Sequence, residues 1–165
     1  MTASSGHVAY IGLGSNLDVP RSQVERGLQA IDVLPQSRLL RRSRLYACAP
    51  WGVVDQPEFV NGVAAIETQL SPRALMQALL GVEESFGRRR GAERWGPRIL
   101  DLDLLLFDAA IIDEPGLRVP HPHLHERAFV LLPLADVAPR LQVPGQGAVA
   151  DLLSCVDAST CRVLD

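Results

Sequence analysis

The sequence contains no lysine, and all 16 of its basic residues are arginine. A Walker A phosphate-binding loop requires a lysine, and so does the ATP site of a protein kinase. Both are therefore excluded, together with any mechanism that proceeds through a lysine Schiff base. If the protein handles phosphate groups, it must do so with arginine, histidine or a metal ion.

Cysteines and long apolar runs are also scarce. The three cysteines, Cys48, Cys155 and Cys161, show no Cys-x-x-Cys spacing, so neither a disulfide framework nor a cysteine zinc site is indicated. No apolar run reaches the ~18 residues that a membrane helix needs. Residues 1–7 lack the basic and apolar regions of a signal peptide. We therefore expect a cytoplasmic protein that does not enter the membrane.

The chain has enough apolar sequence for a single buried core. Its 165 residues are 47% hydrophobic, which predicts one globular domain over residues 1–165. The formal net charge is −3, so the molecule as a whole is not expected to bind nucleic acid. Any positive patch must be local.

Hydrophobic periodicity predicts an ordered series of strands and helices. The expected elements are a strand over 8–13, a helix over 18–34, strands over 39–47 and 59–68, a helix over 71–86 and a strand over 99–107. A loop is expected over 48–58, a hairpin over 111–119 and a weak helix over 149–156. This order is the split βαβ arrangement, with its two helices on one face. We predict an α+β, ferredoxin-like fold, in which helices pack on a mostly antiparallel sheet in αβα layers.

An Asp-Leu-Asp step inside the last of these strands is the most informative feature. Because side chains alternate along a strand, Asp101 and Asp103 should share one face, while Leu100, Leu102 and Leu104 take the other. Their Cα atoms would lie roughly 6.5–7 Å apart. Two carboxylates held so close require a cation between them, and Mg²⁺ shared with a polyphosphate would supply it. The alternative is a solvated strand face on which each aspartate pairs with an arginine.

Five arginines precede this acid pair. They are Arg88, Arg89, Arg90, Arg94 and Arg98, in a stretch that Gly87, Gly91, Gly96 and Pro97 break into a loop. Guanidinium groups grip phosphate oxygens in pairs, so the loop suits an anionic, metal-chelated substrate. A solvated basic loop that partly neutralises the aspartates remains the alternative.

Other candidate residues lie on the neighbouring elements. Phe59 and Asn61 should share one face of their strand. Glu83 falls near the C-terminal end of its helix, where a carboxylate is unfavourable without a partner, although its spacing alone favours a paired acid on the surface. Residues 121–125 contain three alternate histidines, which a zinc ion could use, although one histidine acting with Arg127 as an anion contact is favoured.

These motifs resemble the 6-hydroxymethyl-7,8-dihydropterin pyrophosphokinase family of the folate pathway. The family signature Arg-x-Gly-Pro-Arg-x-x-Asp-Leu-Asp, followed by two aliphatic residues, is present over residues 94–105. Further matches are found at residues 14–16, 50–52, 55–57, 59–61, 119–121 and 126–129. The resemblance runs in order from about Ala9 to Pro139.

The resemblance implies a reaction and a set of residues. The hydroxymethyl oxygen of the pterin attacks the β-phosphorus of ATP, so that diphosphate is transferred and AMP is released. Asp101 and Asp103 match the aspartates that hold two Mg²⁺ ions with ATP, and Arg88 and Arg98 join them as catalytic residues. The ATP-binding positions are Glu83, Arg90, Arg94, Trp95, Leu104, His121 and Arg127.

For the pterin, the resemblance implies an aromatic sandwich. Phe59 and Phe129 would hold the flat ring, and Asn61 would pair with its hydrogen-bonding edge. Cys48, Ala49 and Trp51 belong to the loop at the same site. The expected partners are ATP and 6-hydroxymethyl-7,8-dihydropterin, with no nucleic acid and no membrane, and the protein is expected to be a monomer.

Two other functions stay open at this point. The split βαβ arrangement also occurs in RNA-binding and small-ligand regulatory domains, but the acid pair would repel a phosphate backbone without metal. A different metal-dependent nucleotidyltransferase or phosphatase could use the same Asp-x-Asp step. Neither explains why Phe59, Asn61 and Phe129 occur together with it.

Overall fold

A computed structural model describes residues 6–50, 55–87 and 99–164. Its centre is a six-stranded sheet in the order β10-β3-β4-β1-β5, with β2 also paired to β4, and its strands pair antiparallel. The strands are β1 (His7–Ser15), β2 (Ser37–Arg42), β3 (Tyr46–Cys48), β4 (Phe59–Thr68), β5 (Asp101–Phe107) and β10 (Cys161–Val163). The predicted α+β class and the mostly antiparallel sheet are confirmed.

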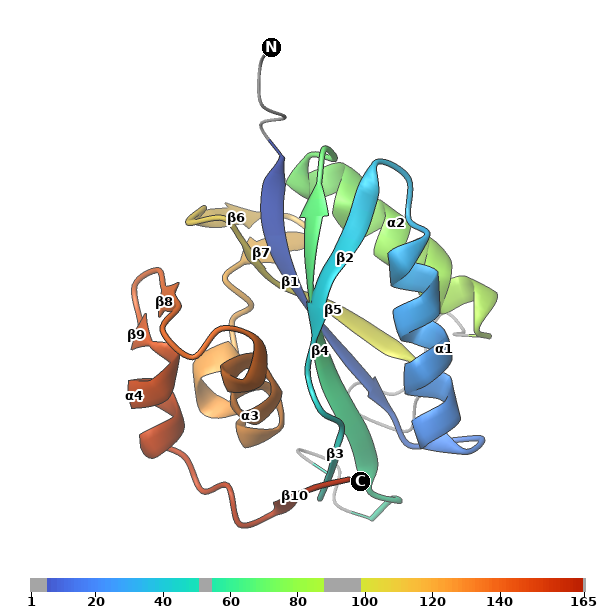
Figure 1. Ribbon diagram of the computed structural model, residues 1–165, viewed down its shortest axis with the longest axis vertical. Coiled ribbons are helices and arrows are strands. Elements are labelled where there is room, and N and C mark those ends of the chain that lie inside the picture. Colours follow the sequence, from blue (N-terminus) through green and yellow to red (C-terminus); the bar gives the residue numbers. More distant parts are fainter. Residues whose placement is uncertain (1–5, 51–54, 88–98, 165) are drawn as a thin grey trace.

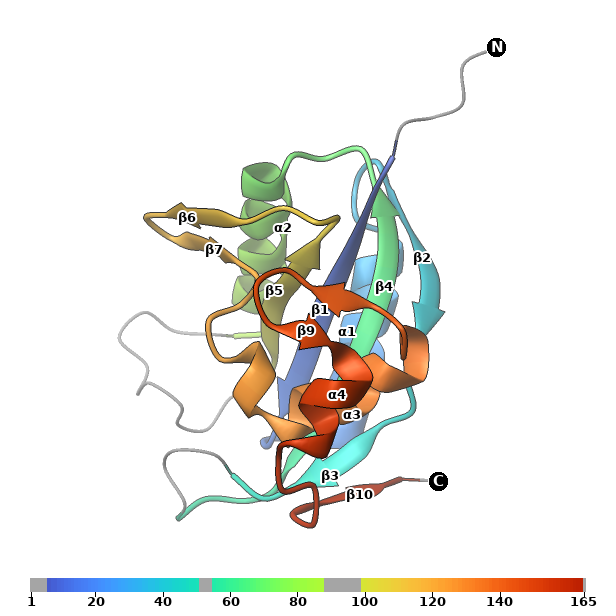
Figure 2. The same ribbon diagram turned by 90° about the vertical axis from the view of Figure 1, so that its left-hand side faces the viewer.

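Helices cover both faces of this sheet (Figure 1). Helices α1 (Pro20–Asp32) and α2 (Pro72–Ser85) lie on one face, and α3 (Ala128–Val137) and α4 (Val149–Ser154) lie on the other. Figure 2 shows α3 and α4 in front of the sheet, with α1 and α2 behind it. The αβα layers predicted from the sequence are therefore present.

The first two helices begin where the sequence predicts them. Both have a proline in the first turn, and the Ser71 hydroxyl accepts a hydrogen bond from the Ala74 backbone N–H at 3.1 Å. Their buried stripes follow the predicted helical spacing and include Val24, Leu28 and Ile31 on α1 and Leu75 and Leu79 on α2. Packing of these stripes against the sheet stabilises this layer.

The single strand predicted over 39–47 is wrong. Two strands, β2 and β3, replace it, because the chain leaves the ladder with β4 after Arg42 and rejoins it at Tyr46. Between the two strands, the Ser43 hydroxyl accepts a hydrogen bond from the Val63 backbone N–H at 2.8 Å. Cys48 is the last residue of β3, so the loop predicted from residue 48 begins one residue later.

Smaller elements complete the chain. They are β6 (Ile112–Glu114), β7 (Leu117–Val119), the 3-10 helix η1 (Leu124–Glu126), β8 (Gln142–Val143) and β9 (Gly147–Ala148). The β6–β7 hairpin and α4 confirm the expected hairpin and the weak helix. Strand β10 at the sheet edge was not predicted.

Alternate residues of the central strands serve two separate cores. Ile11, Leu13, Val60 and Ile66 pack with α1 and α2, whereas Tyr10, Val63 and Ala65 pack with α3. In the described part of the chain, no helix is both long and apolar enough to cross a bilayer.

Candidate active site

Two glycines on the central strand form the floor of the site. Gly14 of β1 pairs with Asn61 on β4 and with Asp101 on β5, and Gly12 pairs with Asp103. A Cβ atom added at Gly14 would lie 2.8 Å from the Asn61 Oδ1 atom, which is closer than real contacts allow. The glycines therefore leave open space between β4 and β5 on this face.

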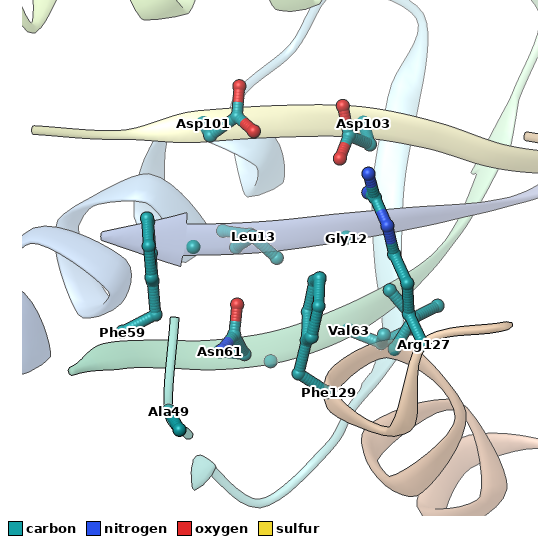
Figure 3. Close-up of a pocket in the computed structure, with 13 residues that line it drawn as sticks. Gly12, Leu13, Ala49, Phe59, Asn61, Val63, Asp101, Asp103, Arg127 and Phe129 are labelled. Atoms are coloured by element: carbon teal, nitrogen blue, oxygen red, sulfur yellow. The ribbon is translucent and has the colours of Figure 1, made fainter. Parts of the chain in front are cut away.

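A cavity of about 630 Å³, its open mouth included, occupies this space. It is lined by Gly12, Leu13, Gly14, Ala49, Phe59, Asn61, Gly62, Val63, Asp101, Asp103, Arg127, Phe129 and Val130. Figure 3 shows Phe59 and Phe129 on either side of Asn61, with the two aspartates across the strand from them. The shape suits a flat ring held between aromatic side chains.

Asn61 supplies the polar group at the base of the cavity. The residue is 5% exposed, and its Nδ2 atom has no hydrogen-bond partner among the residues that the structure describes. A buried amide without a partner costs free energy, so this N–H₂ group suits a ligand with a hydrogen-bond acceptor on its edge. The predicted common face of Phe59 and Asn61 is confirmed by the lining of the cavity.

Asp101 and Asp103 lie on one face of β5, as alternation predicts. Both line this cavity and also a second, larger one of about 1410 Å³. Leu100, Leu102 and Leu104 belong to the core on the opposite face. The carboxylates therefore lie at the boundary between the two cavities, where groups bound in each could meet.

His121 lies beside the second carboxylate. Its Nε2 atom is 4.0 Å from Asp103 Oδ1, and its Nδ1 atom accepts a hydrogen bond from the His123 backbone N–H at 3.2 Å. Burial lowers the pKa of His121 to about 4, and the positive charge of Arg127 contributes. The imidazole is then neutral at pH 7, with its proton on Nε2 and directed toward Asp103.

Arg127 connects the aromatic pocket to the acidic edge. It precedes α3, is 6% exposed, and its guanidinium carbon lies 5.3 Å from the centre of the Phe129 ring. Figure 3 shows its side chain extending toward Asp103. Because Arg127 lines both cavities, it can contact an anion bound in either one.

The second cavity lies between β5, α2, β7 and the residues that follow β7. Its lining includes Glu83, Leu104, Arg118, His121 and Arg127. Glu83 is 1% exposed, and its Oε2 atom accepts a hydrogen bond from the Leu102 backbone N–H at 2.7 Å. This bond gives the carboxylate one partner near the helix C-terminus, and the burial of Glu83 shows that the paired surface acid favoured from its spacing is wrong. It also fixes the start of β5 against α2.

Residues outside the lining hold the aromatic wall in position. Asp136 of α3 accepts hydrogen bonds from the Tyr46 hydroxyl at 2.8 Å and from Arg44 Nη2 at 3.0 Å. Burial, with the hydrogen bond to Asp136, raises the pKa of Tyr46 to about 12. These bonds join β3 to the helix that carries Phe129.

A second contact anchors the loop before β4. Asn16 Nδ2 donates to Gln56 Oε1 at 2.8 Å and to the Pro57 carbonyl at 3.1 Å.

The sequence prediction includes no role for Tyr46, Asp136 or the floor glycines. The Gly-x-Gly spacing of residues 12–14 is the signal in the sequence that could have indicated this floor.

Some predicted residues are not part of this site, and others lie outside the described residues. Ala49 lines the first cavity, whereas the side chain of Cys48 is buried in β3 and is not part of the lining. The predicted residues that lie outside the described part of the chain are Trp51, Arg88, Arg89, Arg90, Arg94, Trp95 and Arg98. In the described part of the chain, no group of three or more His, Cys, Asp or Glu side chains could hold a metal ion.

Comparison with known proteins assigns the family. Residues 10–139 match the family described as 7,8-dihydro-6-hydroxymethylpterin-pyrophosphokinase (HPPK). Proteins named 2-amino-4-hydroxy-6-hydroxymethyldihydropteridine pyrophosphokinase are similar to the chain. The one from Pseudomonas aeruginosa is 51% identical over 88% of this chain and 89% of its own length, and the one from Haemophilus influenzae is 43% identical over 88% and 90%.

A solved structure supports the fold. A crystal structure of wild-type Plasmodium falciparum HPPK-DHPS with STZ-DHP superposes with a TM-score of 0.73 at 13% sequence identity. The match covers 92% of this chain but only 43% of the Plasmodium chain, so the likeness concerns one part of that longer protein. With the family match over most of its length, the chain belongs to the 7,8-dihydro-6-hydroxymethylpterin-pyrophosphokinase family.

Proposed function

We propose that the chain is a pyrophosphokinase that transfers diphosphate from ATP to 6-hydroxymethyl-7,8-dihydropterin, releases AMP, and so serves folate biosynthesis. Family membership supports the reaction class. The observation that carries the proposal is the first cavity, in which Phe59, Phe129 and the buried Asn61 amide adjoin Asp101 and Asp103. A flat-ring pocket beside paired carboxylates has the two parts that this reaction requires.

The pterin ring would lie between Phe59 and Phe129. Its polar edge would accept a hydrogen bond from the Asn61 Nδ2 atom, whose lack of a partner among the described residues supports this pairing. In this orientation the hydroxymethyl group would point toward the aspartates on β5. Gly12 and Gly14 leave the space below the ring, since any side chain there would occupy it.

ATP would lie in the second cavity, with its phosphates at the boundary formed by Asp101 and Asp103. Mg²⁺ usually takes one or two carboxylates and completes its shell with water and substrate phosphates, so this pair fits two Mg²⁺ ions bound together with ATP. The bound ions would neutralise charge on the polyphosphate. Glu83, Leu104, His121 and Arg127 line the ATP side.

The chain's own residues would position the reacting groups. The hydroxymethyl oxygen attacks the β-phosphorus, a new O–P bond forms, and the bond to the oxygen shared with the α-phosphorus breaks to release AMP, while the hydroxyl proton passes to solvent. Arg127 would offset negative charge on the phosphates, and the neutral His121 would donate one hydrogen bond from Nε2. Roles for Arg88 and Arg98 in catalysis, for Arg90, Arg94 and Trp95 at ATP, and for Trp51 and Cys48 at the pterin rest on the sequence resemblance. A monomeric, cytoplasmic enzyme also stays a prediction.

A product assay tests this function. The purified protein is incubated with ATP, Mg²⁺ and 6-hydroxymethyl-7,8-dihydropterin, and the nucleotides are separated by chromatography. AMP that forms only when the pterin is present is the expected result. ADP as the product, or ATP consumption that does not depend on the pterin, would contradict the proposal.

A variant of the pocket makes the assay specific. Asn61→Ala removes the buried amide, so the KM for the pterin should rise roughly 10–100-fold, corresponding to ~1–3 kcal/mol for a lost buried hydrogen bond. The affinity for ATP should stay unchanged, because Asn61 is not in the lining of the second cavity. Equal loss of affinity for both substrates would count against the assignment of the two cavities.

A further inference from the structure

Two cysteines face each other across the edge of the sheet, next to the wall of the first cavity. Cys161 of β10 pairs with Cys48 of β3, and Cys48 pairs in turn with Phe59 of β4. Residues directly opposite in an antiparallel ladder point to the same face. The three side chains therefore form a row that ends at an aromatic residue of the cavity.

The backbone hydrogen bonds show whether Cys48 and Cys161 form a hydrogen-bonded or a non-hydrogen-bonded pair of the antiparallel ladder. The bonds on either side run from Ala49 N to the Thr160 carbonyl at 3.0 Å and from Leu164 N to the Leu45 carbonyl at 2.8 Å. Because hydrogen-bonded pairs alternate along an antiparallel ladder, Cys48 and Cys161 occupy a non-hydrogen-bonded pair. The Cα atoms of such pairs lie ~4.5 Å apart, which falls within the ~4.4–6.8 Å range that disulfides span.

The two thiols differ in access and in reactivity. Cys48 is 1% exposed, whereas Cys161 is partly exposed, and both are free thiols. Their mutual hydrogen bond raises the pKa of the Cys48 thiol and lowers that of Cys161. Cys161 is therefore the thiol that solvent reaches and that more readily forms the nucleophilic thiolate.

We infer that Cys48 and Cys161 form a reversible disulfide by exchange with a low-molecular-weight disulfide. The Cys161 thiolate attacks one sulfur of that disulfide, its S–S bond breaks, and one thiol is released. Cys48 then loses its proton to solvent and attacks the Cys161 sulfur, which releases the second thiol. The two cysteines are oxidised and the small disulfide is reduced to two thiols.

The bond would tie the C-terminal strand to the strand beside the cavity. Within the described residues, β10 has β3 as its strand partner, so three residues of pairing hold it in the sheet. A covalent link from residue 48 to residue 161 closes most of the chain into one loop, which restricts the unfolded state. The oxidised protein should therefore melt roughly 5–15 °C above the reduced protein.

The test uses the full-length protein under native conditions. It is equilibrated with oxidised glutathione, trapped by alkylation, and analysed by intact mass and by peptide mapping. We expect the loss of two hydrogens, a Cys48–Cys161 link, the higher melting temperature, and reversal by dithiothreitol. Stable glutathione adducts on Cys161 without this link would overturn the inference.

Two single variants give matched controls. Cys155→Ser removes the exposed third cysteine and should leave both the link and the melting shift intact. Cys161→Ser should abolish both, and it should fold because its side chain is partly exposed on an edge strand. A melting shift that persists in Cys161→Ser, or a link that requires Cys155, would contradict the pairing.

Discussion

The two faces of strands β1, β4 and β5 differ in the side chains that they present. Toward α1 and α2, side chains such as Ile11 and Ile66 are fully buried in an apolar core. Toward α3, beside a second apolar core, the same strands present glycine, a buried amide that has no partner within the described residues, and two carboxylates around an open cavity. Strand alternation thus places the cavity on the face opposite α1 and α2, one residue away from side chains of their core. Substitutions on the two faces should therefore have different consequences.

The largest effect is expected on the face of the sheet that lines the first cavity. Asp103→Asn should lower kcat/KM about 1,000-fold or more, which corresponds to ~4 kcal/mol of transition-state stabilisation. Residues that only support a metal ligand are worth ~10–100-fold, so the loss of a ligand itself should cost more. The melting temperature should change by less than ~2 °C, since the carboxylate is partly exposed. Steady-state kinetics and calorimetry measure the two effects, and Asp113→Asn on the exposed hairpin β6 is the matched control. Near-normal turnover would refute the role of the carboxylate.

The opposite pattern is expected in the core. Ile66→Ala removes a fully buried side chain from the α1 and α2 face, which should destabilise the protein by ~2–5 kcal/mol. The rate per folded molecule should be unchanged. Urea unfolding with active-site titration checks this, and Ile111→Ala, at a 72% exposed isoleucine, should be nearly neutral. A specific loss of turnover in folded Ile66→Ala would break the division between the faces.

Gly14→Ala probes the floor of the cavity. Its Cβ would lie 2.8 Å from Asn61 Oδ1 and would displace the amide, and a lost buried hydrogen bond is worth ~1–3 kcal/mol, so pterin affinity should fall roughly 5–150-fold. Isothermal titration with the pterin and with an ATP analogue should show that only the pterin is affected. Gly81→Ala on α2, whose new Cβ would meet no side chain of the described residues within 4 Å, should bind both ligands normally. Unchanged pterin binding by Gly14→Ala would mean that the ring lies elsewhere.

The smallest effect is expected at the surface. Arg42 forms two hydrogen bonds with Glu25, at 2.7 and 3.0 Å, and Arg42→Ala should cost only ~0.2–1 kcal/mol. The hydrogen bond from Arg42 lowers the pKa of Glu25 below its ordinary value of 4.5. The stability difference between wild type and variant should therefore be full above pH 4.5 and vanish as the pH falls through the lowered pKa. Urea unfolding across this range measures it, and activity should not change.

The sequence predicted the parts of the structure that depend on local periodicity. The helices over residues 20–32 and 72–85 and the shared faces of Phe59 with Asn61 and of Asp101 with Asp103 all follow from spacing. These features required no knowledge of which strands pair. They also include the residues that line the proposed pterin site.

What the sequence did not predict depends on partners far away in the chain. The break at Ser43 depends on a hydrogen bond with Val63, and β10 depends on pairing with β3. The importance of Gly14 comes from the neighbouring strand, where Asn61 would meet any side chain placed there. Such contacts become visible only when the register of the sheet is known.

The sharpest test of the proposed site is a crystal structure with an ATP analogue, Mg²⁺ and 6-hydroxymethyl-7,8-dihydropterin. We expect the pterin ring between Phe59 and Phe129, a hydrogen bond from Asn61 Nδ2 to its edge, and metal ions on Asp101 and Asp103. A pterin bound outside this cavity, or phosphates held away from the two carboxylates, would contradict it.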